Sequence, residues 1–259
     1  MKLLFVGDIV GRAGRKILSE QLGRLIDRRM VDLVVANGEN AAAGFGLTAS
    51  VLKELFAAGV DVVTSGNHIW DKKEINDALE REPRLLRPAN YPPGLPGRGA
   101  GIFETAAGIK VGVLNLEGRV FMKNLDCPFR AADELTAELR QQTPVVFVDF
   151  HAEASSEKQA LGYYLAGKVS AVVGTHTHVQ TADERILDGH TGYLTDVGMT
   201  GSRDAIIGNQ IEPAIQRFLT QQPVRLEVAK KDPHLCAVLL TINEETGCCE
   251  EIERIQEIS

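Results

Sequence analysis

The stretch KLLFVGD, residues 2–8, shows the pattern on which the fold of this chain depends: a short apolar run that ends in a glycine and a carboxylate. Similar runs follow at residues 33–36 and 60–64, and segments with apolar residues at helical spacing separate the three, at 15–29 and 48–58. Strands that lack a polar face and alternate with helices are typical of a mainly parallel sheet covered by helices on both sides. The sequence therefore predicts an α/β fold.

The remainder of the chain extends this pattern without a clear linker or internal repeat. Thr48 is the expected N-cap of the helix at 48–58. Further elements are expected as a helix at 71–80, a Pro-, Gly- and Arg-rich loop at 83–99, a hairpin around Gly108, a strand–helix–strand series at 145–150, 155–166 and 170–173, and an antiparallel pair at 235–242 and 249–255. We expect residues 1–259 to form a single domain.

Composition narrows the classes of protein to consider. The chain has 259 residues, of which 44% are hydrophobic and 24% charged, as in ordinary globular proteins. It contains no apolar run of the roughly 18 residues that a membrane span needs, and Asp8 comes too early for a signal peptide, so we expect a cytoplasmic protein. The net charge of -7 argues against a stable partner among long nucleic acids.

Polar residues of the types that bind metals follow five of the expected strands. The five clusters are Gly7-Asp8, Gly38-Glu39-Asn40, Gly66-Asn67-His68, Asp149-Phe150-His151 and Gly174-Thr175-His176-Thr177-His178. Parallel strands bring their carboxyl ends to one edge of a sheet, where ligands bind. We therefore expect these clusters to meet in one crevice, although 170 residues of sequence separate the first from the last.

The residue types in these clusters suit divalent cations. Carboxylates, amide oxygens and imidazoles without a thiolate are ligands for Mn, Fe, Zn or Co. Taken alone, Asp8 could be a helix cap and His151 a buried, hydrogen-bonded histidine. Taken together and in order, the clusters favour a metal site, whose cations would attract a phosphate anion to an acidic protein.

The motifs also resemble those of a known superfamily. The order Gly-Asp, acid, Gly-Asn-His, His and Gly-x-His-x-His, which spans residues 7–178, is similar to that of the calcineurin-like metallophosphoesterases. The strings GDIVGR (7–12), NGENAA (37–42) and SGNHIWD (65–71) resemble the YmdB-like branch, a bacterial group associated with cyclic-nucleotide phosphodiesterase activity. The resemblance implies a two-sheet sandwich flanked by helices, with two metal ions at the carboxyl ends of the strands.

The resemblance also implies a role for each motif residue, with two departures from the superfamily pattern. Val10 stands where the superfamily usually has a metal-binding histidine, and Glu39 stands where the bridging acid is usually aspartate. The implied ligands are Asp8, Glu39, Asn40 and His178 for one ion and Glu39, Asn67, His151 and His176 for the other, with His68 as the catalytic histidine. The oxygen-rich first site makes Fe or Mn more favourable than Zn.

The predicted function is hydrolysis of a small, cyclic nucleotide phosphoester by attack of a bridging hydroxide, with His68 as proton donor. The alternatives are a phosphomonoesterase or nucleotidase on the same metals, an RNase, and a regulatory metal-binding protein with little turnover. Arg12, Arg119 and Arg203 are candidates for phosphate contacts, and Phe45 could stack on a base or pack under its own loop. The resemblance further suggests a homo-oligomer.

Overall fold

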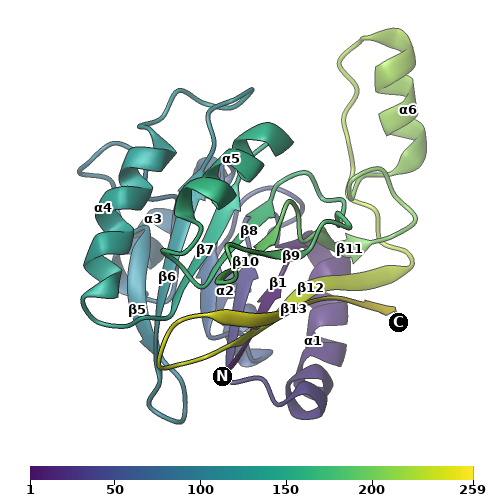
Figure 1. The fold of residues 1–259 in the computed structure, drawn as a ribbon. Coiled ribbons are helices and arrows are strands. Elements are labelled where there is room, and N and C mark those ends of the chain that lie inside the picture. Colours follow the sequence, from purple (N-terminus) through teal and green to yellow (C-terminus); the bar gives the residue numbers. More distant parts are fainter. Residues whose placement is uncertain (259) are drawn as a thin grey trace.

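Two β-sheets pack face to face in the computed structural model, which describes residues 1–258 (Figure 1). Within these residues the first sheet has seven strands and the second has six. The strands of the first sheet are β1 (Lys2–Val6), β2 (Asp8–Ile9), β3 (Leu33–Asn37), β4 (Val62–Thr64), β11 (Met199–Ser202), β12 (Pro233–Ile242) and β13 (Cys249–Ile258). Those of the second are β5 (Ala100–Glu104), β6 (Lys110–Glu117), β7 (Val146–His151), β8 (Ala171–Thr175), β9 (Arg185–Leu187) and β10 (Thr191–Leu194).

Each sheet contains one group of neighbouring parallel strands together with antiparallel strands. The first runs in the order β2-β11-β12-β1-β3-β4, with β13 on β12, and β1, β3 and β4 are parallel. The second runs β5-β6-β7-β8-β10-β9, and its four central strands are parallel. Each parallel group thus ends in a row of loops at one edge of its sheet.

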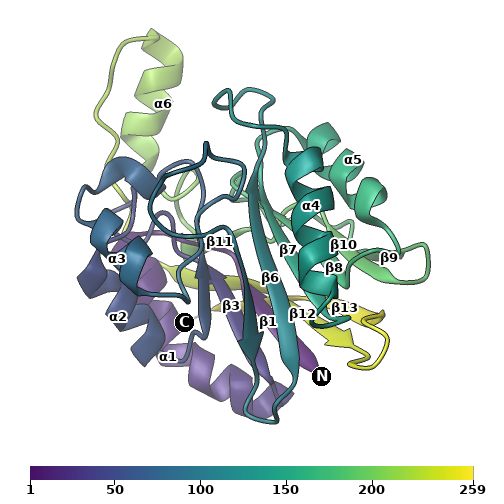
Figure 2. The ribbon, with the colours of Figure 1, turned by 90° about the vertical axis from the view of Figure 1, so that its left-hand side faces the viewer.

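Helices cover the outer faces of both sheets, as Figure 2 shows. The covering helices are α1 (Gly11–Arg29), α2 (Ala49–Ala57) and α3 (Ile75–Arg81) on the first sheet, and α4 (Pro128–Arg140) and α5 (Ser155–Leu165) on the second. The chain also contains the 3-10 turn η1 (Ile69–Asp71) and the helix α6 (Ile211–Thr220). Alternate residues of β1 serve the two interfaces: Leu4 faces the helices, whereas Phe5 lies between the sheets, with its ring centroid 4.8 Å from that of Phe147. Both faces of the strand are apolar for this reason.

The two-sheet sandwich implied by the resemblance is confirmed. Reading the strands as one sheet covered by helices was wrong, because an apolar strand face looks the same whether a helix or another sheet packs on it. The hairpin around Gly108 and the antiparallel pair at the C-terminus are confirmed. The helix expected at 71–80 was placed too early: η1 ends at Asp71 and α3 begins at Ile75.

Residues 203–232 form an arm that carries α6 away from the sheets (Figures 1 and 2). Ala214 is buried, whereas Phe218 and Leu219 are 72% and 80% exposed. The sequence reading missed α6, and it also missed α4, whose buried side contains small residues such as Ala132 and Thr136 rather than a leucine stripe. Among residues 1–258, no helix combines the length and the apolar character needed to cross a membrane.

Candidate metal centre

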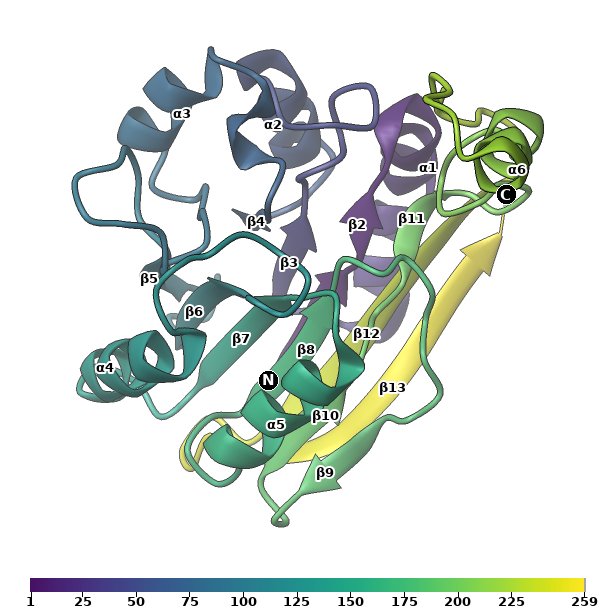
Figure 3. The same ribbon diagram turned by 90° about the horizontal axis from the view of Figure 1, so that it is seen from above.

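The predicted site residues come together where the carboxyl ends of the two sheets meet. Viewed from above, β2 and β3 of the first sheet lie beside β7 and β8 of the second (Figure 3). Glu39 and Asn40 follow β3, and Asn67 and His68 follow β4. The site residues by sheet are Asp8, Glu39, Asn40, Asn67 and His68 from the first, and His151, His176 and His178 from the second. The cluster is therefore shared between two sheets.

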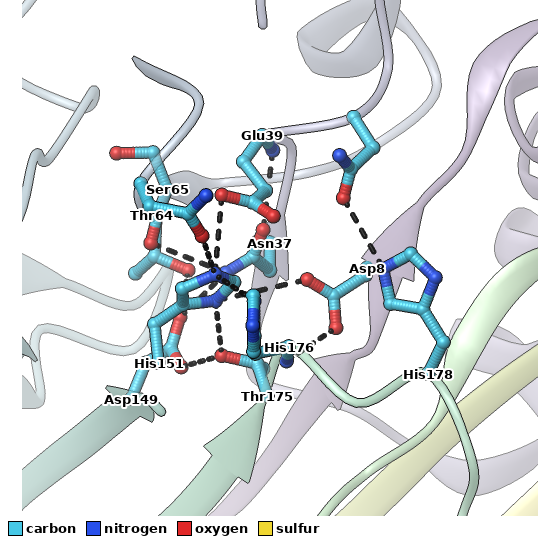
Figure 4. A network of polar contacts seen from close by, with 12 residues as sticks. Asp8, Asn37, Glu39, Thr64, Ser65, Asp149, His151, Thr175, His176 and His178 are labelled. Atoms are coloured by element: carbon cyan, nitrogen blue, oxygen red, sulfur yellow. Dashed lines mark hydrogen bonds and ion pairs between the residues drawn. The ribbon is translucent and has the colours of Figure 1, made fainter. Parts of the chain in front are cut away.

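The first group of candidate ligands surrounds the Nε2 atom of His151. This atom lies 3.2 Å from Glu39 Oε2, 2.9 Å from Asn67 Oδ1 and 3.0 Å from His176 Nδ1. Figure 4 shows the side chains of Glu39, His151 and His176 pointing toward one another. The Glu39, His151 and His176 ligand atoms lie within 4.8 Å of one another, which is close enough to share one cation.

A second group lies beside the first and shares Glu39 with it. Ligand atoms of Asp8, Glu39 and His178 lie within 4.8 Å of one another, and His178 Nε2 is 3.3 Å from Asn40 Oδ1. The Oδ2 atom of Asp8 accepts a hydrogen bond from the His176 amide, 3.1 Å away. Its Oδ1 atom is buried and has no hydrogen-bond partner among residues 1–258, which is the arrangement expected of an oxygen that binds a cation.

The glycine of the Gly66-Asn67-His68 motif makes room for this cluster. A Cβ atom on Gly66 would lie 2.3 Å from the His151 ring and 2.4 Å from Glu39 Oε2. Any side chain at this position would push the two candidate ligands apart. The motif therefore needs a glycine because of a close approach across the two sheets, in addition to the turn after β4.

Charged groups in the cluster strongly affect one another. Burial acts to raise the pKa of Glu39, but the charge of His151 and its hydrogen bond outweigh burial and lower the pKa to about 2. Burial acts to lower the pKa of His151, whereas Glu39, Asp8 and Asp149 raise it to about 9. Burial and the neighbouring His151 lower the pKa of His176 to about 3. The carboxylates thus favour positive charge between them, which suits divalent cations.

Asp149 lies directly behind the candidate ligands and is fully buried. It accepts hydrogen bonds from Thr64 and Asn37 of the first sheet and from Thr175 of the second (Figure 4). Burial raises its pKa to about 7, and the Thr64 hydrogen bond and the charge of His151 oppose this shift. The sequence reading listed Asp149 only as part of a strand end and missed its role as a hydrogen-bond centre.

His68 lies at the edge of the cluster rather than in its floor. Its amide donates to Glu39 Oε2, 3.3 Å away, and its Nδ1 atom is 2.8 Å from Asp71 Oδ2. The sequence reading missed Asp71, although its place three residues after His68 puts both on one side of a single helical turn. Asp71 orients the His68 ring through Nδ1, so Nε2, on the other side of the ring, points away from Asp71.

A pocket of about 360 Å³ opens over the cluster. Its floor includes Glu39, Asn40, His176 and His178, and its wall includes His68, Phe45, Ile207 and Val228. Phe45 is 42% exposed, and its ring meets the His68 ring edge-on at 5.1 Å between centroids, so it does not pack under its own loop. The pocket thus combines a charged floor with an apolar wall.

The arginines proposed as phosphate contacts do not line this pocket. Arg203 pairs with Asp232 on the arm, and neither Arg12 nor Arg119 is among the residues that line the pocket within the described chain. Lys123 contacts one of the motif residues, since its Nζ atom donates to the Asn67 carbonyl oxygen, 3.3 Å away. Glu117, which the sequence reading also missed, is buried at the end of β6 in register with His151.

A protein-family model and a curated relative both match nearly the whole chain. The sequence model of the YmdB-like protein family matches residues 4–255. A 2′,3′-cyclic-nucleotide 2′-phosphodiesterase of Bacillus subtilis is 50% identical over 255 residues, which cover 98% of this chain and 96% of that protein.

Two solved structures have the same fold over the whole chain. A hypothetical protein from Thermus thermophilus is 44% identical with a TM-score of 0.93, and the match covers 100% of this chain and 99% of that one. A phosphatase from Mycoplasma pneumoniae is 34% identical, also with a TM-score of 0.93, and covers 100% of this chain and 93% of its own.

Proposed function

We propose, from the premise that the chain belongs to the YmdB-like family of metallophosphoesterases, that it is a metal-dependent phosphodiesterase acting on small cyclic nucleotides. The observation that carries the proposal is the pair of ligand groups that share Glu39, with the unpartnered Asp8 oxygen among residues 1–258. The B. subtilis relative, which is 50% identical and is a 2′,3′-cyclic-nucleotide 2′-phosphodiesterase, supports cyclic nucleotides as the substrate class.

Two divalent cations fit the two groups of residues. Asp8, Glu39, Asn40 and His178 would hold one, and Glu39, Asn67, His151 and His176 would hold the other. When bound, the ions would supply charge to neutralise the phosphoryl oxygens and to activate water as a nucleophile. Since four of the seven side chains offer oxygen, we propose Mn or Fe in preference to Zn.

His68 would supply the proton that the departing alkoxide needs. As a donor, His68 would act as an imidazolium: its Nδ1–H donates to Asp71, and its second proton, on Nε2, would pass to the leaving oxygen, which leaves a neutral imidazole. The ring forms part of the pocket wall next to the ligand cluster, where a leaving oxygen would lie. Proton donation to a poor leaving group increases the rate about 10²–10⁴-fold.

The pocket wall supports a nucleotide over a bare phosphoester. Phe45 exposes part of its ring beside His68, and Ile207 and Val228 add further apolar surface to the pocket lining. A base could stack on Phe45 while its phosphate reaches the floor, and Lys123 beside Asn67 would attract the negative charge.

The test compares substrates on one preparation loaded with Mn²⁺. We expect bis-p-nitrophenyl phosphate and 2′,3′-cyclic AMP to be hydrolysed faster than p-nitrophenyl phosphate, and EDTA to stop all three reactions. Preference for the monoester would instead indicate a phosphomonoesterase or nucleotidase. A protein that binds Mn²⁺ but hydrolyses none of the three would favour a regulatory role.

A further inference from the structure

We propose that Thr175 and Asp149 form a hydrogen-bonded relay that holds the proton of His151 on Nδ1 and so presents Nε2 to the metal site. The inference rests on the proposed function, because it assigns His151 as a ligand. Thr175 Oγ1 lies 2.9 Å from His151 Nδ1 and 2.8 Å from Asp149 Oδ1. All three side chains are buried at the carboxyl ends of β7 and β8.

The direction of each hydrogen bond follows from the chemistry of Asp149. An ionised carboxylate only accepts, so the Thr175 hydroxyl must donate its one proton to Asp149. The hydroxyl oxygen is then the acceptor for His151, whose Nδ1 must carry a proton. With the proton kept on Nδ1, the lone pair that a cation can take is the one on Nε2, the atom that faces Glu39, Asn67 and His176.

Asp149 also anchors the first sheet to the relay. The side chains of Thr64 and Asn37 donate to its Oδ2 atom, and the Oδ1 atom of Asn37 accepts from the Glu39 amide. One carboxylate is therefore connected to His151 on the second sheet and to the backbone of Glu39 on the first. Hydrogen bonds behind metal ligands of this kind raise metal affinity by fixing the ligand's tautomer and orientation.

The chain offers a matched pair of positions for testing the relay. Thr175 and Thr64 are both buried threonines that donate to Asp149, but Thr175 also contacts His151. A purely structural role for the Asp149 network predicts similar losses from Thr175→Val and Thr64→Val. The relay predicts that Thr175→Val affects metal binding much more.

The experiment measures Mn²⁺ affinity by calorimetric titration at pH 8. It compares the wild type with Thr175→Val, Thr175→Ser, Thr64→Val and His151→Ala. The melting temperature of each variant shows whether it is folded. We expect Thr175→Val to lower the affinity about 10–100-fold. Thr175→Ser, which keeps the hydroxyl, should retain affinity close to that of the wild type, and so should Thr64→Val.

A spectroscopic measurement on the wild type tests the relay even if Thr175→Val does not fold. In protein loaded with diamagnetic Zn²⁺, long-range ¹H–¹⁵N correlation should show the His151 proton on Nδ1. A proton on Nε2, or equal losses of affinity in Thr175→Val and Thr64→Val, would overturn the relay. If His151→Ala binds Mn²⁺ as tightly as the wild type, the ligand assignment in the proposed function fails, and the relay with it.

Discussion

Polar side chains at the two ends of the parallel strands serve different purposes. Where strands begin, Asp61 Oδ2 accepts from the Val34 amide at 2.8 Å and Ser170 Oγ accepts from the Val146 amide at 3.1 Å. Where strands end, buried oxygens of Asp8 and Glu117 have no hydrogen-bond partner within residues 1–258.

The difference separates residues that stabilise the fold from residues that serve the site. A side chain that accepts from the first amide of a neighbouring strand fixes the register and satisfies a backbone group. A buried carboxylate oxygen left without a donor costs free energy in the protein alone, and a bound cation beside Asp8 would compensate this cost.

Asp8→Asn should reduce turnover to the level of chelator-treated wild type. It removes a proposed charged ligand from the cluster, and it also removes one negative charge from a buried group that includes Glu39. The melting temperature of the metal-free variant should therefore be no lower than that of the metal-free wild type. Mn²⁺-dependent hydrolysis of bis-p-nitrophenyl phosphate and thermal melts measure the two effects. A variant that unfolds at lower temperature would show that Asp8 stabilises the fold instead.

His68→Ala should lower turnover about 10²–10⁴-fold, because it removes the proposed proton donor. His68 lies beside the cluster rather than in either of the two ligand groups, so the amount of bound Mn²⁺ should not change. Metal analysis of the purified variant and single-turnover rates measure these quantities. Normal turnover with full metal content would exclude His68 from the reaction.

Phe45→Ala should raise KM for 2′,3′-cyclic AMP about tenfold, which is within the usual contribution of one stacked base. KM for ribose 2′,3′-cyclic phosphate, which has no base, should stay the same. Phe121→Ala is the matched control, because Phe121 is 90% exposed and is not among the residues that line the pocket in the described chain. Equal effects of Phe45→Ala on both substrates would contradict base stacking.

Asp61→Asn should slightly raise the melting temperature at pH 7 and leave turnover unchanged. Partial burial raises the pKa of Asp61, against the Val34 hydrogen bond and the charge of Arg84, so ionisation of this carboxyl costs stability in the folded chain. The neutral Asp61 carboxyl makes its full contribution to folding stability below the ordinary aspartate pKa of about 3.9. This contribution is lost as the pH rises through the raised pKa of the folded protein. The advantage of the amide should thus disappear below that pH in thermal melts. A loss of turnover would mean that the two strand ends are not functionally distinct.

The sequence was sufficient for the local features of this protein. The five clusters at strand ends could be identified because apolar runs and the residues that end them are adjacent in the chain. The Thr48 cap could be predicted for the same reason, and its hydroxyl does accept from the Val51 amide. Element boundaries were less accurate, as at α3, because Asp71 and Ile75 fall on either side of a turn with no distinctive residue.

The tertiary structure alone decided which segments face each other. No local pattern could show that Thr175 would lie between Asp149 and His151, or that Gly66 must stay small because His151 and Glu39 meet beside it. These relations join residues on separate strands. The sequence by itself therefore determined the kinds of side chain in the candidate metal centre and their places at strand ends. The packing of the two sheets decided how those side chains combine into one site. This packing could not be predicted, because the apolar face of a strand does not specify which distant segment covers it.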